Sequence, residues 1–179
     1  MMSDLHIEHR WFWAWQDEQE EKWLEEMSER GFHLVKPGFF GRYEFRKGAP
    51  NRYVYRLDFL TNSQQKKDYL QLFADAGWEY VGEFGSWQYF RRPAGEQENG
   101  EIFTDVTSKI AKYQRVMFFL LILTPVYLMP IQFKGILEGR YHWVMLAFYF
   151  VWFMALCMEI FAMIKLIQRI NQLKNTLKQ

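Results

Sequence analysis

The stretch "WLEEMSERGFHLVKPGFFGRYEFR", from Trp23 to Arg46, is echoed by "YLQLFADAGWEYVGEFGSWQYFRR", from Tyr69 to Arg92. Each stretch has the pattern of a helix that stops at a glycine and is followed by two short strands. Gly31 aligns with Gly77, and Val35 with Val81, at the same offset. The sequence therefore predicts an internal duplication, with repeats at about 8–48 and 51–92.

A strand is predicted before the helix of each repeat. Trp11, Trp13 and Trp15 alternate in "HRWFWAWQ", and Tyr53 and Tyr55 alternate in "NRYVYRLDFL". Strict alternation is typical of a strand with one buried face. Each repeat is therefore expected to be strand-helix-strand-strand, and residues 1–92 are expected to form a duplicated α+β domain. Pairing of the repeats about a pseudo-twofold axis would bury more apolar surface than one repeat could.

The alternation places many aromatic rings on one face of the combined sheet. That face is either the core beneath the two helices or, if two slender helices cannot cover so many rings, a cleft between the repeats. Aromatic clefts suit flat or cationic apolar ligands. The candidate ligand-binding residues are Trp11, Trp13, Tyr53, Tyr55, Trp78, Tyr80, Trp87 and Tyr89.

Two long apolar runs follow the repeats. Residues 116–133 carry no charge, and residues 143–164 carry one, Glu159. As helices at about 1.5 Å per residue, the runs would be about 27 and 33 Å long, enough to cross a bilayer. The sequence predicts a linker and lead-in helix at 93–115, a transmembrane hairpin at 116–165 and an amphipathic cytoplasmic tail at 166–179. Pro125 and Pro130 leave two alternatives for the first span, a kinked helix or a re-entrant loop.

Charge sets the expected orientation in the cell membrane. Basic residues precede the first run and follow the second, so both termini are expected to face the cytoplasm. Glu159 lies within about two turns of the cytoplasmic end of its helix, where its side chain could reach the interface. The alternative for this carboxylate is a proton or ion role inside the membrane.

Composition and motifs argue against several classes of function. The chain has 16 Lys and Arg against 19 Asp and Glu before Val116, and 6 against 2 from there onward. The first part therefore lacks the basic surface that binding of nucleic acid requires. Cys157 is the single cysteine of the sequence, which excludes an intramolecular disulfide. No phosphate-binding loop, nucleophile elbow or metal-spaced set of His and Cys occurs, so no enzyme, cofactor or metal site is expected.

Several phrases resemble a known family. "EEKWLEEMSERGFHL", "YVYRLDFL", "AGWEYVGEFGSWQYFRRPAGE" and "EIFTD" are similar to the domain-of-unknown-function family 2812. The resemblance implies a membrane protein of Gram-positive bacteria that is often encoded beside PadR-type regulators. The repeat order is also similar to the paired modules of GyrI-like ligand-binding domains. Those domains commonly use a buried acid, and the sequence does not indicate which residue that would be here.

These observations favour a membrane-anchored cytoplasmic module that senses a ligand or docks a partner at the inner membrane surface. The expected partners are the bilayer, a protein partner or second copy of the chain, and a small apolar or cationic ligand. Two alternatives remain: a small accessory subunit of a transport system that uses Glu159, and a structural adaptor whose aromatic face is entirely core.

Overall fold

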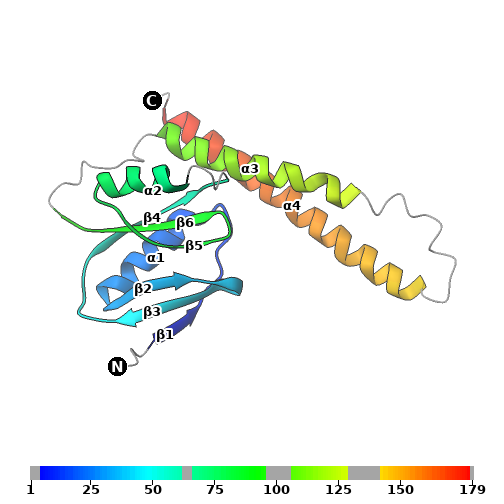
Figure 1. Ribbon diagram of the computed structural model, residues 1–179. Helices are drawn as coiled ribbons and strands as arrows, with labels where there is room; N and C mark the ends of the chain where they lie inside the picture. The colour runs from blue at the N-terminus through cyan, green and yellow to red at the C-terminus, as the bar shows by residue number, and fades with distance from the viewer. Residues whose placement is uncertain (1–4, 62–65, 96–105, 129–141, 178–179) are drawn as a thin grey trace. The chain divides into compact units, whose positions relative to one another are not determined.

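The computed structural model describes residues 5–61, 66–95, 106–128 and 142–177 (Figure 1). The chain divides into two compact units, Met1–Lys112 and Tyr113–Gln179. The first unit contains two three-stranded antiparallel sheets with helices packed against them, and the second contains long apolar helices. The predicted α+β class is confirmed.

The two sheets follow one another along the chain. Sheet A and its helix comprise β1 (Leu5–His9), α1 (Asp17–Glu29), β2 (Phe32–Pro37), a 3-10 turn (Phe39–Gly41) and β3 (Arg42–Lys47). Sheet B and its helix comprise β4 (Tyr53–Phe59), α2 (Lys66–Asp75), β5 (Glu79–Phe84) and β6 (Trp87–Pro93). The strand orders are β1-β3-β2 and β4-β6-β5, so both halves have the same topology.

The halves also match in local detail. Gly31 has φ 83° directly after α1, and Gly77 has φ 81° directly after α2. A residue with a Cβ is strained in this left-handed conformation, which is why a glycine ends each helix. The register shifts between Leu34 and Lys36 in sheet A and between Tyr80 and Gly82 in sheet B. The bulges therefore fall at Val35 and Val81, the residues that align in the sequence.

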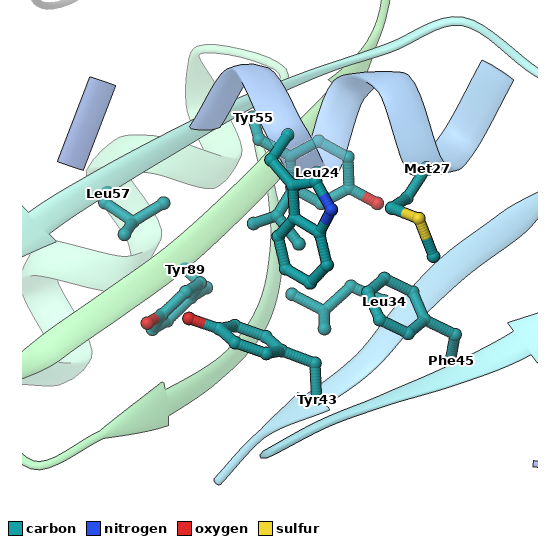
Figure 2. Packing of buried hydrophobic residues seen from close by; sticks show 9 residues of the cluster. Leu24, Met27, Leu34, Tyr43, Phe45, Tyr55, Leu57 and Tyr89 are labelled. Carbon is teal, nitrogen blue, oxygen red and sulfur yellow. The ribbon is translucent and has the colours of Figure 1, made fainter. Parts of the chain in front are cut away.

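The layers of the first unit are stacked in the order sheet A, α1, sheet B, α2 (Figure 1). Trp23, Leu24 and Met27 of α1 share one core with residues from both sheets. Phe73 of α2 packs in a second core against Phe90, on the opposite face of sheet B. The expected pseudo-twofold pairing is therefore wrong, because α1 lies between the sheets whereas α2 packs on sheet B alone in these cores. Figure 2 shows the first core, with side chains from α1, sheet A and sheet B.

Side chains of α1 also pair with the free edge of β4. Ser28 Oγ, Glu25 Oε1 and Glu21 Oε1 accept hydrogen bonds from the backbone N–H groups of Tyr53, Tyr55 and Leu57, at 3.4, 3.2 and 2.7 Å. Helical positions three and four apart lie on one side of α1, and alternate N–H groups point to one edge of a strand. One side of α1 therefore takes the place of a neighbouring strand.

The outer face of sheet A, on the side away from α1, has a different character. Leu5 and Ile7 are about half exposed there, and their register partners are Arg46 and Glu44. The corresponding face of sheet B carries Tyr55, Leu57 and Tyr89, which are buried against α1. Sheet A thus presents a mixed, partly charged surface where sheet B presents a core.

The first strand does not lie where the sequence placed it. β1 is Leu5–His9, and residues 10–16 form a connection with a turn, so Trp11, Trp13 and Trp15 are not on a strand. The ladder ends where Arg10 N–H donates to Gly41 O at 2.8 Å, because the chain then has to turn into α1 at Asp17. Phe12, between the exposed rings, is the residue that packs against the core.

The second unit contains most of α3 (Val106–Leu128) and all of α4 (His142–Thr176). Within the described residues, α4 is the one helix long and apolar enough to cross a membrane, over Leu146–Thr176. Of the first predicted span, 116–133, the structure describes residues 116–128, which belong to α3. The remainder of that span, the loop at 134–141 and linker residues 96–105 lie outside the described residues. The tail predicted from residue 166 continues α4 without a break to Thr176.

Candidate functional site

A cavity of about 150 Å³ lies at the N-terminal end of α1, where loops from both halves meet. The segment before α1, the β2–β3 connection and the β5–β6 hairpin all contribute to its wall. Exposed Trp11 and Trp13 form the outer part, and buried Glu20, Tyr43 and Tyr89 form the inner part. The lining residues are Trp11, Phe12, Trp13, Ala14, Asp17, Glu20, Pro37, Gly38, Gly41, Tyr43, Phe84, Trp87 and Tyr89.

Glu20 is the polar centre of this cavity. Its side chain belongs to the first turn of α1 and is 7% exposed. The hydroxyls of Tyr43 and Tyr89 both donate to Glu20 Oε1, each at 2.7 Å. Figure 2 shows the two hydroxyls directed to one point, from sheet A and from sheet B. The carboxyl group therefore joins both sheets at the cavity wall.

The carboxyl group of Glu20 has no cationic partner among the described residues. Burial raises its pKa from an ordinary 4.5 to about 7, against the two tyrosine hydrogen bonds, which lower it. Burial and the neighbouring Glu20 carboxyl also raise the pKa of Tyr43 and Tyr89, so both hydroxyls stay protonated as donors. The guanidinium of Arg10 lies 5.2 Å from the ring centre of Phe12 and stacks there. The site is thus an aromatic cavity with one buried acid whose charge is not neutralised.

Two local contacts hold the aromatic segment in place. Trp13 N–H donates to Gln16 Oε1 at 3.0 Å, and the rings of Trp13 and Trp15 stack 5.4 Å apart. Gly41, at φ 67°, lies so close to this segment that a Cβ would be 2.3 Å from Arg10 O. A side chain at position 41 would therefore force the β2–β3 connection and the segment before α1 apart.

The structure separates the eight aromatic residues selected from the sequence. Trp11, Trp13, Trp87 and Tyr89 line the cavity.

The other four do not. Tyr55 is fully buried in the core, and Tyr53 packs against His33 and Arg91. Trp78 and Tyr80 lie on the α2 side of sheet B, against Phe90. The bulge at Val81 is the reason, because one extra residue moves the residues before it to the opposite face from the one that alternation predicts.

Sequence reasoning missed Glu20 and Tyr43. Glu20 precedes Trp23, Leu24 and Met27 by three, four and seven residues, so it occupies the apolar stripe of α1. A carboxylate on a buried stripe is the signal that could have identified it. The acidic run "DEQEE" instead looks like a solvated helix start.

The second polar group of interest, Glu159, lies in the second unit. Its Oε1 accepts a hydrogen bond from Thr124 Oγ1 at 3.1 Å, and the residue is 7% exposed. The side chain is thus buried beside α3. In the described part of the chain, no group of three or more His, Cys, Asp or Glu side chains could hold a metal ion.

Comparison with known proteins gives one match. No curated protein and no solved structure matches the chain. A family model described as "Protein of unknown function (DUF2812)" matches residues 16–124, which include α1, both sheets beyond β1, α2 and most of the described part of α3. This match covers more than half of the chain, so the protein belongs to the DUF2812 family of proteins of unknown function.

Proposed function

We propose that this protein is a membrane-anchored binding module whose cavity takes a small, flat, apolar cation, with Glu20 as its counterion. The observation that carries the proposal is the buried Glu20 carboxyl, which is surrounded by aromatic rings and forms no ion pair within the described residues. Such a group is costly to ionise in the empty cavity. A bound cation would remove that cost.

The shape and chemistry of the cavity support this ligand class. A volume of about 150 Å³ holds one ring of benzene size. The rings of Trp13, Trp87 and Phe84 provide flat apolar walls, and their faces attract cations. The two tyrosine hydroxyls hold the carboxyl group in place, so little order has to be created on binding.

Protonation gives the proposal a pH signature. With a pKa of about 7, Glu20 is partly protonated in the empty cavity at neutral pH. A cation binds the ionised form better, so affinity rises as the pH passes through about 7 and levels off above it. The charged and titratable neighbours of this carboxyl are Asp17, Tyr43 and Tyr89, with Arg10 close to Tyr43.

The anchoring part of the proposal rests on α4. Its apolar segment, Leu146–Thr176, supports at least one span. We further propose that the two apolar runs form the hairpin predicted from the sequence, with both termini in the cytoplasm. A regulatory role for the module would agree with the resemblance to a family encoded beside PadR-type regulators.

The experiment compares three ring compounds of one shape. Binding of benzamidinium, neutral benzamide and anionic benzoate to the full chain in detergent micelles is measured by isothermal titration calorimetry at pH 8. We expect benzamidinium to bind and the other two to bind at least tenfold more weakly. Glu20→Gln keeps the shape and removes the charge, so it should weaken benzamidinium binding by a similar factor. Equal binding of all three compounds, or no effect of Glu20→Gln, would contradict the proposal.

One alternative has an observation of its own. Glu159 is buried and hydrogen-bonded to Thr124, which would suit a proton or ion role in a transport accessory subunit. Glu159→Gln would abolish such a role and leave benzamidinium binding unchanged. A structural adaptor would show no saturable binding at all.

A further inference from the structure

We infer that Lys112 of α3 controls the affinity of the cavity, because a bound cation competes with Lys112 for Asp17 and thereby releases the start of α3. The inference rests on the proposed function, since it requires a cation in the cavity. It assigns to Lys112 the part of a positioning residue that acts through Asp17.

Asp17 takes part both in the cavity wall and in an ion pair with α3. It lines the cavity, and it forms an ion pair with the ammonium group of Lys112. Both side chains are buried, with exposures of 2% and 7%. Lys112 also donates to Leu57 O at 3.1 Å, on the free edge of β4. This pair therefore fastens the first turns of α3 to α1 and sheet B inside the first unit.

The charge of Lys112 is fixed by its neighbours. Burial lowers its pKa, but the carboxylates of Asp17 and Glu21 outweigh burial and raise the pKa above the ordinary value. Asp17 lies one turn before Glu20 on α1, and its charge raises the pKa of Glu20. Lys112 thus neutralises a negative charge that would otherwise add to the potential in the cavity.

A ligand cation in the cavity competes with Lys112 for Asp17. A ligand cation next to Glu20 lies near Asp17, and it repels the ammonium group of Lys112 while it competes for the same carboxylate. Binding of the ligand therefore weakens the hold on α3. Because coupling between two sites is reciprocal, loss of Lys112 must strengthen ligand binding by the same factor.

The same helix provides a matched control. Lys109 lies one turn earlier on α3 and pairs with Glu18 at 3.4 Å, in a partly exposed position away from the cavity lining. An exposed pair of this kind contributes little.

α3 continues past Lys112 into the second unit, so a loosened start of α3 would report cavity occupancy to the apolar helices.

The test uses the full chain in detergent micelles and benzamidinium as the probe. Lys112→Met should raise the affinity about fivefold or more, and Lys109→Met should stay within about twofold. Asp17→Asn should lower the affinity, and adding Lys112→Met to Asp17→Asn should then change nothing further, because Lys112 acts through Asp17. Saturating benzamidinium should also speed amide hydrogen exchange at residues 106–112 of the unaltered protein, which a merely structural lysine would not cause.

Each outcome separates the two proposals. Binding that depends on Glu20 but is unchanged or weakened by Lys112→Met overturns the coupling and leaves the proposed function standing. If Lys112→Met does not fold, the exchange measurement on the unaltered protein decides: unchanged exchange at 106–112 overturns the coupling, and faster exchange supports it. Failure of benzamidinium to bind the unaltered protein overturns both.

Discussion

At the scale of single residues, the buried carboxyl groups of α1 divide into two kinds. Glu21 is buried beside Arg56 and close to the charge of Lys112, and its Oε1 accepts from a backbone N–H. Glu20 has two neutral hydroxyl donors and no cation among the described residues. A positively charged guest can pair with Glu20 without displacing a cation from it, which is why the site is assigned to Glu20.

The raised pKa of Glu20 predicts how the stability of the empty protein depends on pH. Between pH 4.5 and 7 the folded state binds more protons at this group than the unfolded state, so the contribution of Glu20 to stability is fully present below pH 4.5 and is lost as the pH rises through about 7. Glu20→Gln should remove this contribution and stabilise the protein above pH 7 by about 1–3 kcal/mol. Thermal unfolding of the full chain at pH 5 and pH 8 measures both effects.

Glu21 limits the size of that change. Its pKa is also raised by burial to about 7, so a pH dependence of the same sign remains in the Glu20→Gln variant. The matched control is Glu26→Gln on the exposed side of α1, which should leave both melting temperatures unchanged. A Glu20→Gln variant with the full pH dependence of the unaltered protein would show that Glu20 is not the group responsible.

At the scale of elements, α1 combines the roles of core helix and strand substitute. Its apolar stripe fills the space between the sheets, and its Glu21, Glu25 and Ser28 side chains accept from alternate N–H groups of β4. An unpaired edge strand is open to other chains. Side-chain acceptors close this one without an additional strand.

This arrangement predicts a specific cost for Glu21→Ala. The Leu57 N–H would lose its acceptor in a buried place, which destabilises the protein by about 1–3 kcal/mol. Glu26→Ala, at an exposed position of the same helix, should stay within about 0.5 kcal/mol. Chemical denaturation measures the loss, and amide hydrogen exchange at Leu57 should accelerate in the first variant alone. Equal stability of both variants would contradict the hydrogen bond as a stabilising contact.

The elements also show what a sequence pattern can and cannot predict. The helices, their glycine stops and the order of strands follow from local signals, so Gly31 and Gly77 were sufficient to align the halves. The position of β1 was not predictable in this way, because aromatic alternation at Trp11–Trp15 is stronger than the signal of Leu5–His9, which is a strand through its pairing with β3. The bulge at Val81 has no local signal either, and it moved Trp78 and Tyr80 away from the site. Half of the eight aromatic candidates therefore line the cavity, and Glu20 was not among the candidates.

At the scale of the whole molecule, the number of spans decides where the ends of the chain lie. One span through α4 places the two termini on opposite sides of the membrane, whereas a hairpin places both on one side. Basic residues at Lys109, Lys112 and Arg115 and again from Lys165 onward favour the hairpin with both ends inside. Reporter fusions at Met1 and Gln179 should both give cytoplasmic signals. A Gln179 fusion that reports outside would leave α4 as a single span.

The stacked order of the layers has a consequence for how many such units can follow one another. Units that stack in the order sheet, helix, sheet, helix have no natural end, because each presents one face to the unit before and another to the unit after. Here both ends are blocked: Glu44 occupies the register position that Tyr89 has in sheet B, and α2 has Lys67 and Gln71 where α1 has Glu21 and Glu25. A lysine cannot accept from a backbone N–H. The chain therefore contains two such units and one junction between them. The cavity lies at this junction.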